Sequence, residues 1–432
     1  MEPLTWIGII SMIIMLALVA IGVPIGFSMI AMSVIGLFMI QGFSPAAAML
    51  YMNAWNKGSD FVMVCIPLFI FMGQMVYHSG IATDLFDCIE RWLSRLPGGL
   101  AITAVFACAA FGAVTGLSVV AVTTMGVIIL PEMKKFNYAP RLSTACLASA
   151  GTLAILIPPS LCMVVYGILT DTSIGRLFIG GIIPGILMSV LFAGMIYIRC
   201  RLNPNLGPVG PHFTWKERFS SLQKVLPVLA IFLLVVGGIY GGFFTPTEAS
   251  GIGASGVILT SLIMGRFKWE KFKLALRETG WISAMVYTTL VGGFLYGRFL
   301  AVTEITNHLV EYISIFNLDK YALVFILTIL YIILGGIMDG WAMLVLSVPF
   351  VFPIVVKAGL DPVWFGIFIT IMTELGLITP PIGLNVYVIQ KMEGTTASKD
   401  IFKAIAPFGV LMLATVALTL LFPDLVLWLS SK

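Results

Sequence analysis

The chain has 432 residues, of which 59% are apolar and only 10% are charged, and its formal net charge is +4. Soluble domains carry about 45–50% apolar and about 25% charged residues, so this chain has too few polar side chains to cover a water-exposed surface. The composition therefore excludes a soluble or a disordered protein. It predicts an all-α polytopic membrane protein, because the apolar runs are long and continuous, whereas a membrane β-barrel alternates over about ten residues.

Several apolar stretches approach or exceed the roughly 20 residues of a transmembrane helix. In chain order they cover residues 5–22, 24–41, 61–79, 141–170, 178–198, 225–244, 249–265, 281–300, 363–390 and 404–422. Residues 43–58 and 81–96 are more polar, and they predict interfacial helices anchored by Trp55 and Trp92.

Two further apolar stretches, 99–131 and 321–356, are interrupted near their middles by Thr115-Gly116 and Asp339-Gly340. Each half has about 15 residues, which is short for a full crossing. We therefore predict two re-entrant helical hairpins, each of which enters and leaves the membrane on one face.

The basic residues predict the orientation. Of the 24 Lys and Arg residues, 18 lie in five clusters, at 91–95, 134–141, 199–224, 266–277 and 391–403. If these clusters are cytoplasmic, the first hairpin opens inward, the second opens outward, and both termini are periplasmic. Two full crossings in each interrupted stretch would give the same alternation, so charge alone does not establish re-entry.

The interrupted stretches begin two copies of an internal repeat. Prolines 131, 140, 158 and 159 recur at 353, 362, 380 and 381, an offset of 222 each time, while the motifs Gly112–Gly116 and Gly336–Gly340 slip by two residues. Two small-residue packing motifs with coincidental prolines are the alternative. Copies that face opposite sides form an inverted repeat, which is the architecture of secondary transporters.

Each copy breaks its helices twice, at the hairpin tip and at the Pro-Pro pair, where ring clashes and missing N–H groups stop a helix. Broken backbone at membrane depth is tolerated where it is buried in protein or lines a cavity. Its carbonyl groups can coordinate a bare cation, and the N–H groups of a half-helix attract an anion. The pattern predicts a cation-coupled anion site.

These residues also carry a family resemblance. The runs Thr115-Gly-Leu-Ser118, Ile157-Pro-Pro-Ser160, Thr170–Gly185, Met338-Asp-Gly340 and Ile378–Gly383 resemble the large membrane subunit (M subunit) of TRAP (tripartite ATP-independent periplasmic) transporters. The resemblance covers nearly the whole chain. It implies a bacterial inner-membrane importer of organic acids that is driven by Na⁺, has no other cofactor, and moves its substrate by an elevator motion.

The resemblance also implies two protein partners, a separate small four-helix membrane subunit and a soluble periplasmic substrate-binding protein. Within the family we favour the sialic-acid branch. A carrier of C4-dicarboxylates or other carboxylates is the alternative, because such carriers share the same breaks.

With sodium implied as the coupling ion, we predict two sodium sites, each between a hairpin tip and the Pro-Pro break of the same repeat. The first uses Gly112, Val114, Thr115, Gly116 and Pro158, and the second uses Gly336, Met338, Asp339, Gly340, Thr379, Pro380 and Gly383. A bulky side chain at Gly116 or Gly340 is expected to keep the carbonyl groups away from the ion.

Substrate contacts are predicted for Ser118, Ser160 and Arg298. Each has a second interpretation. The two serine hydroxyls could instead satisfy freed backbone groups, and Arg298 could extend to the outer lipid headgroups.

Three acidic residues in or beside apolar runs need a role, because ionisable groups are costly there. Asp339 is expected to cap the helix that begins at Gly340 and to help position the second sodium ion. Asp171 is expected to cap the helix that begins near Ser173. For Glu374 the sequence leaves three roles open: a structural role, pairing with another group, or a role in coupling.

The predicted organisation has four parts. Residues 1–58 and 201–300 form a scaffold, the latter with a cytoplasmic loop, and residues 59–200 and 301–432 form the two repeats of the transport core. An intramembrane enzyme would need an intramembrane His or paired acids with a nucleophile, and an ion channel is less compatible with two repeats in one chain.

Motifs for other chemistry are weak. Six cysteines form no CxxC pair, three histidines form no metal-binding motif, and the GxGxxG run at Gly251–Gly256 lies in an apolar stretch. We predict close helix packing there instead of nucleotide binding, and no transition metal, nucleic acid or P-loop ATP site.

Overall fold

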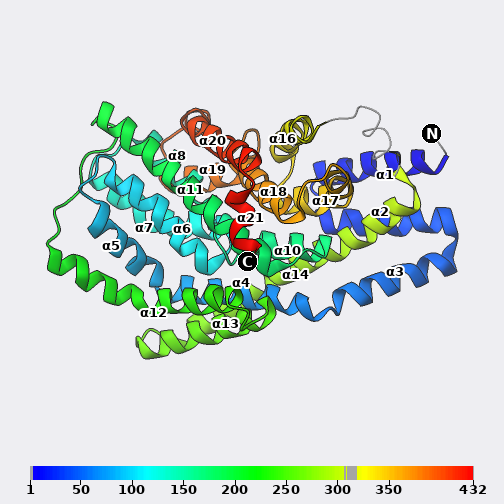
Figure 1. The fold of residues 1–432 in the computed structure, drawn as a ribbon, viewed down its shortest axis with the longest axis horizontal. Helices are drawn as coiled ribbons and strands as arrows, with labels where there is room; N and C mark the ends of the chain where they lie inside the picture. The colour runs from blue at the N-terminus through cyan, green and yellow to red at the C-terminus, as the bar shows by residue number, and fades with distance from the viewer. Residues whose placement is uncertain (1–2, 306–307, 309–318, 432) are drawn as a thin grey trace.

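The computed structural model describes residues 3–305, 308 and 319–431, and all regular structure in these residues is helical (Figure 1). The first part of the chain forms α1 (Pro3–Ala20), α2 (Ile25–Gln41), α3 (Phe43–Gly58), the 3-10 helix η1 (Phe61–Val64), α4 (Cys65–Ser79), α5 (Ile81–Leu93), α6 (Gly99–Thr115), α7 (Ser118–Lys135), α8 (Pro140–Ala150), α9 (Leu153–Leu156), α10 (Leu161–Thr170) and α11 (Ile174–Leu202). The second part forms α12 (Trp215–Tyr240), α13 (Pro246–Ile263), α14 (Trp269–Val302), α16 (Lys320–Ile337), α17 (Gly340–Lys357), α18 (Pro362–Gly376), α19 (Leu384–Glu393), α20 (Ser398–Leu421) and α21 (Asp424–Ser430). The predicted all-α polytopic class is confirmed.

In the described part of the chain, seven helices are long and apolar enough to cross a membrane. They are η1 with α4, α11, α12, α14, α16, α17 and α20, and the segment from α8 to α10, bent by 45° at the first Pro-Pro break, makes an eighth. The shorter apolar helices are α1, α2, α6 and α18.

The hairpin helices are longer than predicted. Helix α6 has 17 residues, and α7, α16 and α17 have 18 each, so the expected halves of about 15 residues are wrong. The apolar run ends at the first charge, but the helix continues through it, as at Lys134 and Lys135 in the last turn of α7. Length alone therefore does not decide whether these helices are re-entrant.

The helix boundaries follow the proline offset. Helix α7 runs from 118 to 135 and α17 from 340 to 357, and α8 and α18 begin at Pro140 and Pro362. Each boundary in the first repeat has its counterpart 222 residues later in the second repeat. The two-residue shift between the glycine motifs therefore does not change where α17 begins and ends relative to α7. The tips are Gly116-Leu117 in one copy and Met338-Asp339 in the other.

The two repeats pack into each other. Helix α6 packs on α8 and α9, and α16 packs on α18, so each hairpin contacts the broken helix of its own repeat. In addition α7 packs on α19 and α17 packs on α10, which joins each hairpin to the far half of the other repeat's broken helix. Each hairpin tip lies beside the Pro-Pro break of its own repeat, Gly116 against Pro159 and Gly336 against Pro380.

The remaining helices pack on one another and on the helices of the repeats, as α5 and α11 do on α6. Helix α2 lies along α14, where a Cβ atom on Gly292 would lie 2.6 Å from the carbonyl oxygen of Gly26. Helix α4 packs on α13, where a Cβ atom on Gly253 would lie 2.5 Å from Sδ of Met72, so close packing explains this glycine of the GxGxxG run. In Figure 1, α12 and α13 lie along the lower edge and α16 and α20 along the upper one. The four-part division of the chain stays a prediction.

Candidate functional site

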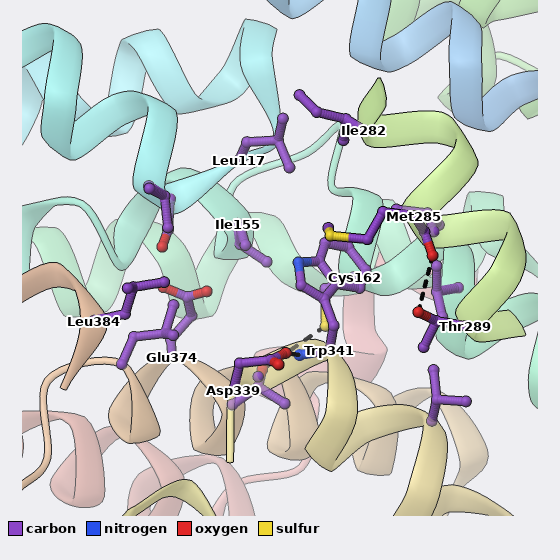
Figure 2. A pocket seen from close by; sticks show the side chains of 18 of the residues that line it. Leu117, Ile155, Cys162, Ile282, Met285, Thr289, Asp339, Trp341, Glu374 and Leu384 are labelled. Atoms are coloured by element: carbon purple, nitrogen blue, oxygen red, sulfur yellow. Dashed lines mark hydrogen bonds between the residues drawn. The ribbon is translucent and has the colours of Figure 1, made fainter. Parts of the chain in front are cut away.

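A cavity of about 480 Å³ lies between the hairpin tips and the α2–α14 pair. The tips contribute Ser118 and Asp339 with its neighbours, the broken helices contribute Cys162 and Glu374, and α14 contributes the face from Ile282 to Leu290. Figure 2 shows Asp339 and Glu374 on one side, with Leu117 and Ile282 across from them. The cavity is large enough for a small organic molecule.

The charged residues that line this cavity are all acidic. Two of its lining residues, Asp339 and Glu374, are acidic, and none of the described residues that line it is a Lys, Arg or His. The rest of the wall is mostly apolar, with Trp341 projecting into the space (Figure 2). An anion in this cavity meets negative charge and no fixed positive side chain.

The residues of the first predicted sodium site come together. Gly116 has φ +62°, and a Cβ atom on it would lie 2.6 Å from the carbonyl oxygen of Pro159, next to Pro158. A Cβ atom on Gly112 would overlap Cα of Ala154. The first hairpin tip therefore lies directly on the first Pro-Pro break.

At this tip the backbone, and not the side chains, faces the Pro-Pro break. Val114 and Thr115 are both buried, and the Thr115 hydroxyl donates to the carbonyl oxygen of Phe111 at 3.1 Å. The carbonyl groups of the last turn of a helix have no partner within that helix. These groups can serve as cation ligands, and sodium binding there stays a prediction.

The second predicted sodium site has a similar close approach. A Cβ atom on Gly336 would lie 3.0 Å from the carbonyl oxygen of Pro380. The Thr379 hydroxyl donates to the carbonyl oxygen of Leu375 at 2.6 Å, and Gly383 turns the chain into α19 with φ +49°. Met338 is buried at the tip. Gly340 faces Thr373 instead of the break, because a Cβ atom on it would lie 3.4 Å from Cβ of Thr373.

Asp339 caps α17, as predicted. Its Oδ1 atom accepts hydrogen bonds from the backbone N–H groups of Trp341 and Ala342, at 2.9 and 3.0 Å. The residue is exposed and lines the cavity. Its second oxygen is therefore available to an ion or a substrate.

The three predicted substrate residues are in different surroundings. Ser118 lines the cavity. Ser160 is buried, does not line the cavity, and caps α10 by accepting from the N–H of Met163 at 3.4 Å, which is the backbone role considered above. Arg298 is exposed on α14 and is not part of the cavity lining. The cavity thus brings Ser118 and Asp339 together and leaves Ser160 and Arg298 out.

A polar cluster beside Ser118 was missed at the level of the sequence. Asn385, fully buried in α19, donates to Oγ of Ser118 at 3.5 Å and to the carbonyl oxygen of Ala148 at 3.3 Å. The carboxylate of Glu374, 2% exposed, lines the same cavity as Ser118. An amide in the apolar run just after a Pro-Pro break was the available signal for Asn385.

The expected cap by Asp171 is wrong. Ser173 caps α11 by accepting from the N–H of Arg176, while Asp171 ends α10 with φ +53°. Its carboxylate pairs with Lys57 Nζ at 3.5 Å. Ser173 directly precedes α11, so its hydroxyl can reach the backbone N–H groups of the first turn, and Ser173 takes the capping position.

Comparison with known proteins decides the family. A family model described as "Tripartite ATP-independent periplasmic transporter, DctM component" matches residues 12–425. The chain belongs to this family. This DctM-family chain is therefore a multi-pass membrane transporter permease, a class of protein that is not a class of enzymes.

Relatives of this DctM-family chain carry different substrate names. The C4-dicarboxylate TRAP transporter large permease protein DctM of Pseudomonas aeruginosa is 31% identical over 386 residues, covering 89% of this chain and 90% of that protein. The sialic acid TRAP transporter large permease protein SiaM of Vibrio cholerae is 27% identical over 415 residues, covering 96% of each. The sialic-acid branch is one of several that match, so similarity does not select it.

The solved YdaH transporter of Alcanivorax borkumensis has a similar fold. Its TM-score is 0.58 at 13% identity, and the match covers 90% of each chain. This likeness supports the transporter fold and says nothing about substrate.

Proposed function

We propose that this chain is the permease of a sodium-coupled importer of organic acids in the bacterial inner membrane. It works with a small four-helix membrane subunit and receives its substrate from a periplasmic binding protein. The family supports the transporter class, and the cavity between the two hairpin tips supports the coupling.

The charge of the cavity is the observation that carries this proposal. Two unit charges 4 Å apart repel or attract by about 4 kcal/mol at the effective dielectric of a protein site. A carboxylate substrate near Asp339 and Glu374 is therefore unfavourable unless cations bind with it. The sodium ions that compensate for this repulsion also supply the driving force, because they move down their own gradient and the substrate crosses the membrane with them.

The proposed sodium ions bind at the two places where a hairpin tip meets a Pro-Pro break. Gly116 against Pro159 and Gly336 against Pro380 bring carbonyl groups of two segments together. A Cβ atom would clash at Gly116, at 2.6 Å from the oxygen, and would be crowded at Gly336, at 3.0 Å. Such close backbone contact is needed when backbone oxygen atoms must approach one ion.

Movement of the transport core against the scaffold is the proposed transport step. The repeats interlock through α7 with α19 and α17 with α10, while α2 and α3 pack on α14, and α12 packs on α13. The cavity lies between these two groups of helices. A sliding, elevator-type motion would therefore carry the cavity across without breaking the contacts inside either group.

Cysteine labelling tests the orientation of the hairpins. The six native cysteines are all buried, which keeps background reaction low. We expect Asn137→Cys to react rapidly from the cytoplasm and Ala358→Cys from the periplasm, because they lie in loops outside the hairpin helices. A cysteine at the buried Thr115 should react much more slowly than these loop positions, and one at Asp339, which is exposed in the cavity, should react only from the side on which the cavity is open. Full crossings would instead place the tips outside the membrane. If Thr115→Cys reacts as fast as the loop cysteines from the periplasm, and Asp339→Cys does so from the cytoplasm, the hairpin helices cross the membrane and re-entry is wrong.

Uptake into proteoliposomes tests the function. The chain is reconstituted with its small subunit and cognate binding protein, and labelled sialic acid and a labelled C4-dicarboxylate are offered separately. We expect one of them to accumulate with an inward sodium gradient, and accumulation to stop when that gradient is removed or reversed. Equal accumulation without sodium would contradict coupling, and flux that never saturates would support a channel.

A further inference from the structure

We infer that Glu374, Asn385 and Ser118 form a further sodium site, separate from the two sites between the hairpin tips and the Pro-Pro breaks. This inference rests on the proposed function, because it adds a third ion to the same transport cycle. Glu374 in α18 and Ser118 in α7 line the same cavity, and Asn385 in α19 donates a hydrogen bond to Ser118 at 3.5 Å.

Glu374 is a buried carboxylate without a cationic partner. It is 2% exposed, its Oε2 atom has no hydrogen-bond partner among the described residues, and none of the ion pairs in that part of the chain involves it. An isolated charge in such a position is strongly unfavourable, so a buried carboxylate is paired, bound to a cation or neutralised. None of the ion pairs among the described residues supplies the first of these.

The start of α7 offsets part of this charge. Ser118 is the first residue of α7 and lines the same cavity as Glu374. A helix N-terminus is equivalent to about half a positive charge. This partial charge does not neutralise a full carboxylate charge, so compensation is still needed from elsewhere.

Asn385 provides a second oxygen atom without a partner. The residue is fully buried, its amide nitrogen donates to Ser118 and to the carbonyl oxygen of Ala148, and its Oδ1 atom has no partner among the described residues. Both amide hydrogens are thus directed away from Glu374 toward other acceptors. The Asn385 amide oxygen and the Glu374 carboxylate oxygen both lack a partner among the described residues, and Ser118 lies beside Asn385 and in the same cavity wall as Glu374. Amide and carboxylate oxygen atoms are ligands suited to a hard cation.

The position explains what a third ion would do. Glu374 and Ser118 line the cavity together, so an ion bound there lies in the wall that the substrate contacts. Its charge would remove the repulsion between Glu374 and an anionic substrate. We therefore expect sodium to bind here before the substrate does.

Sodium-dependent thermal stabilisation of the purified chain tests this site without partners or substrate. We compare wild type with Glu374→Gln, which keeps the shape and removes the charge, and with Asn385→Ala, which removes the amide oxygen. We expect each variant to need about tenfold more sodium for half-maximal stabilisation, and the sodium response of Glu374→Gln to become less steep. Glu278→Gln is the matched control, because it makes the same exchange in α14, where the carboxylate pairs with His78 at 2.8 Å outside the cavity.

The outcomes separate this inference from the proposed function. If wild type responds to sodium and both variants respond identically to it, Glu374 is neutralised by a proton and the site is wrong, while sodium coupling stands. If wild type itself does not respond to sodium and its uptake is independent of the gradient, the proposed function fails first. If Glu374→Gln does not fold, Asn385→Ala alone decides, because it leaves the carboxylate in place: weaker sodium binding supports the site and an unchanged response overturns it.

Discussion

Replacement of Gly116 by alanine is expected to abolish sodium-driven uptake, whereas the same replacement at Gly340 is expected to leave most of it. At Gly116 a Cβ atom would lie 2.6 Å from the carbonyl oxygen of Pro159, and the backbone has φ +62°. The left-handed conformation costs a non-glycine residue about 1–2 kcal/mol, and the clash separates the tip from the break that it contacts. At Gly340 the nearest atoms are 3.4 Å away, which is ordinary contact.

A third glycine separates the two causes. Gly80 ends α4 with φ +78° and has no atom within 4 Å of an added Cβ, so Gly80→Ala introduces the backbone strain without the clash. We expect Gly80→Ala to lower the unfolding temperature slightly and to keep uptake. The measurement is initial uptake rate against sodium concentration, at matched amounts of inserted protein. Wild-type sodium dependence in Gly116→Ala would show that this contact is not part of a sodium site.

The sequence predicted the order and type of the helices well, because long apolar runs leave little choice in a membrane protein. The proline offset also predicted where α8 and α18 begin, at Pro140 and Pro362. Helix length was less predictable, since α7 continues through Lys134 and Lys135 after the apolar run has ended. Charges at a helix end cost little when the side chains reach the interface, and an apolar count does not include them.

The hairpin tips could be located from the sequence, but the surroundings of single side chains could not. Thr115-Gly116 and Asp339-Gly340 mark the breaks because helix formers are missing there. Whether a serine after such a break faces a cavity or its own backbone depends on which helix packs on it. That is why Ser118 lines the cavity while Ser160 caps α10.

Buried polar partners show the same limit. Glu374 stood out as an acid within an apolar helix, but the sequence does not show which side chains surround it. Ser118, which lines the same cavity, belongs to the other repeat. The hydrogen bond from Asn385 to Ser118 joins residues 267 positions apart. One sequence without its fold contains no information about that contact.

The second large effect is expected at Asp339. Alanine at this position removes both the cap of α17 and the charge, and loss of an N-cap costs about 0.5–2 kcal/mol. Asparagine keeps an oxygen that can accept from Trp341 and Ala342, the bonds that Oδ1 makes now. We expect uptake to fall strongly in both variants, with the asparagine variant close to wild type in thermal stability.

Asp361 supplies the matched control for Asp339, because it caps α18 in the same way. Its Oδ1 atom accepts from the N–H groups two and three residues ahead, at 2.7 and 3.3 Å, and it does not line the cavity. Asp361→Asn should therefore leave both uptake and its sodium dependence nearly unchanged. If Asp339→Asn behaves like Asp361→Asn, with full uptake at unchanged sodium affinity, Asp339 acts as a helix cap and its charge has no role in transport. If it instead needs more sodium than wild type while remaining folded, the loss belongs to the charge that faces the cavity, since the cap is preserved in both variants.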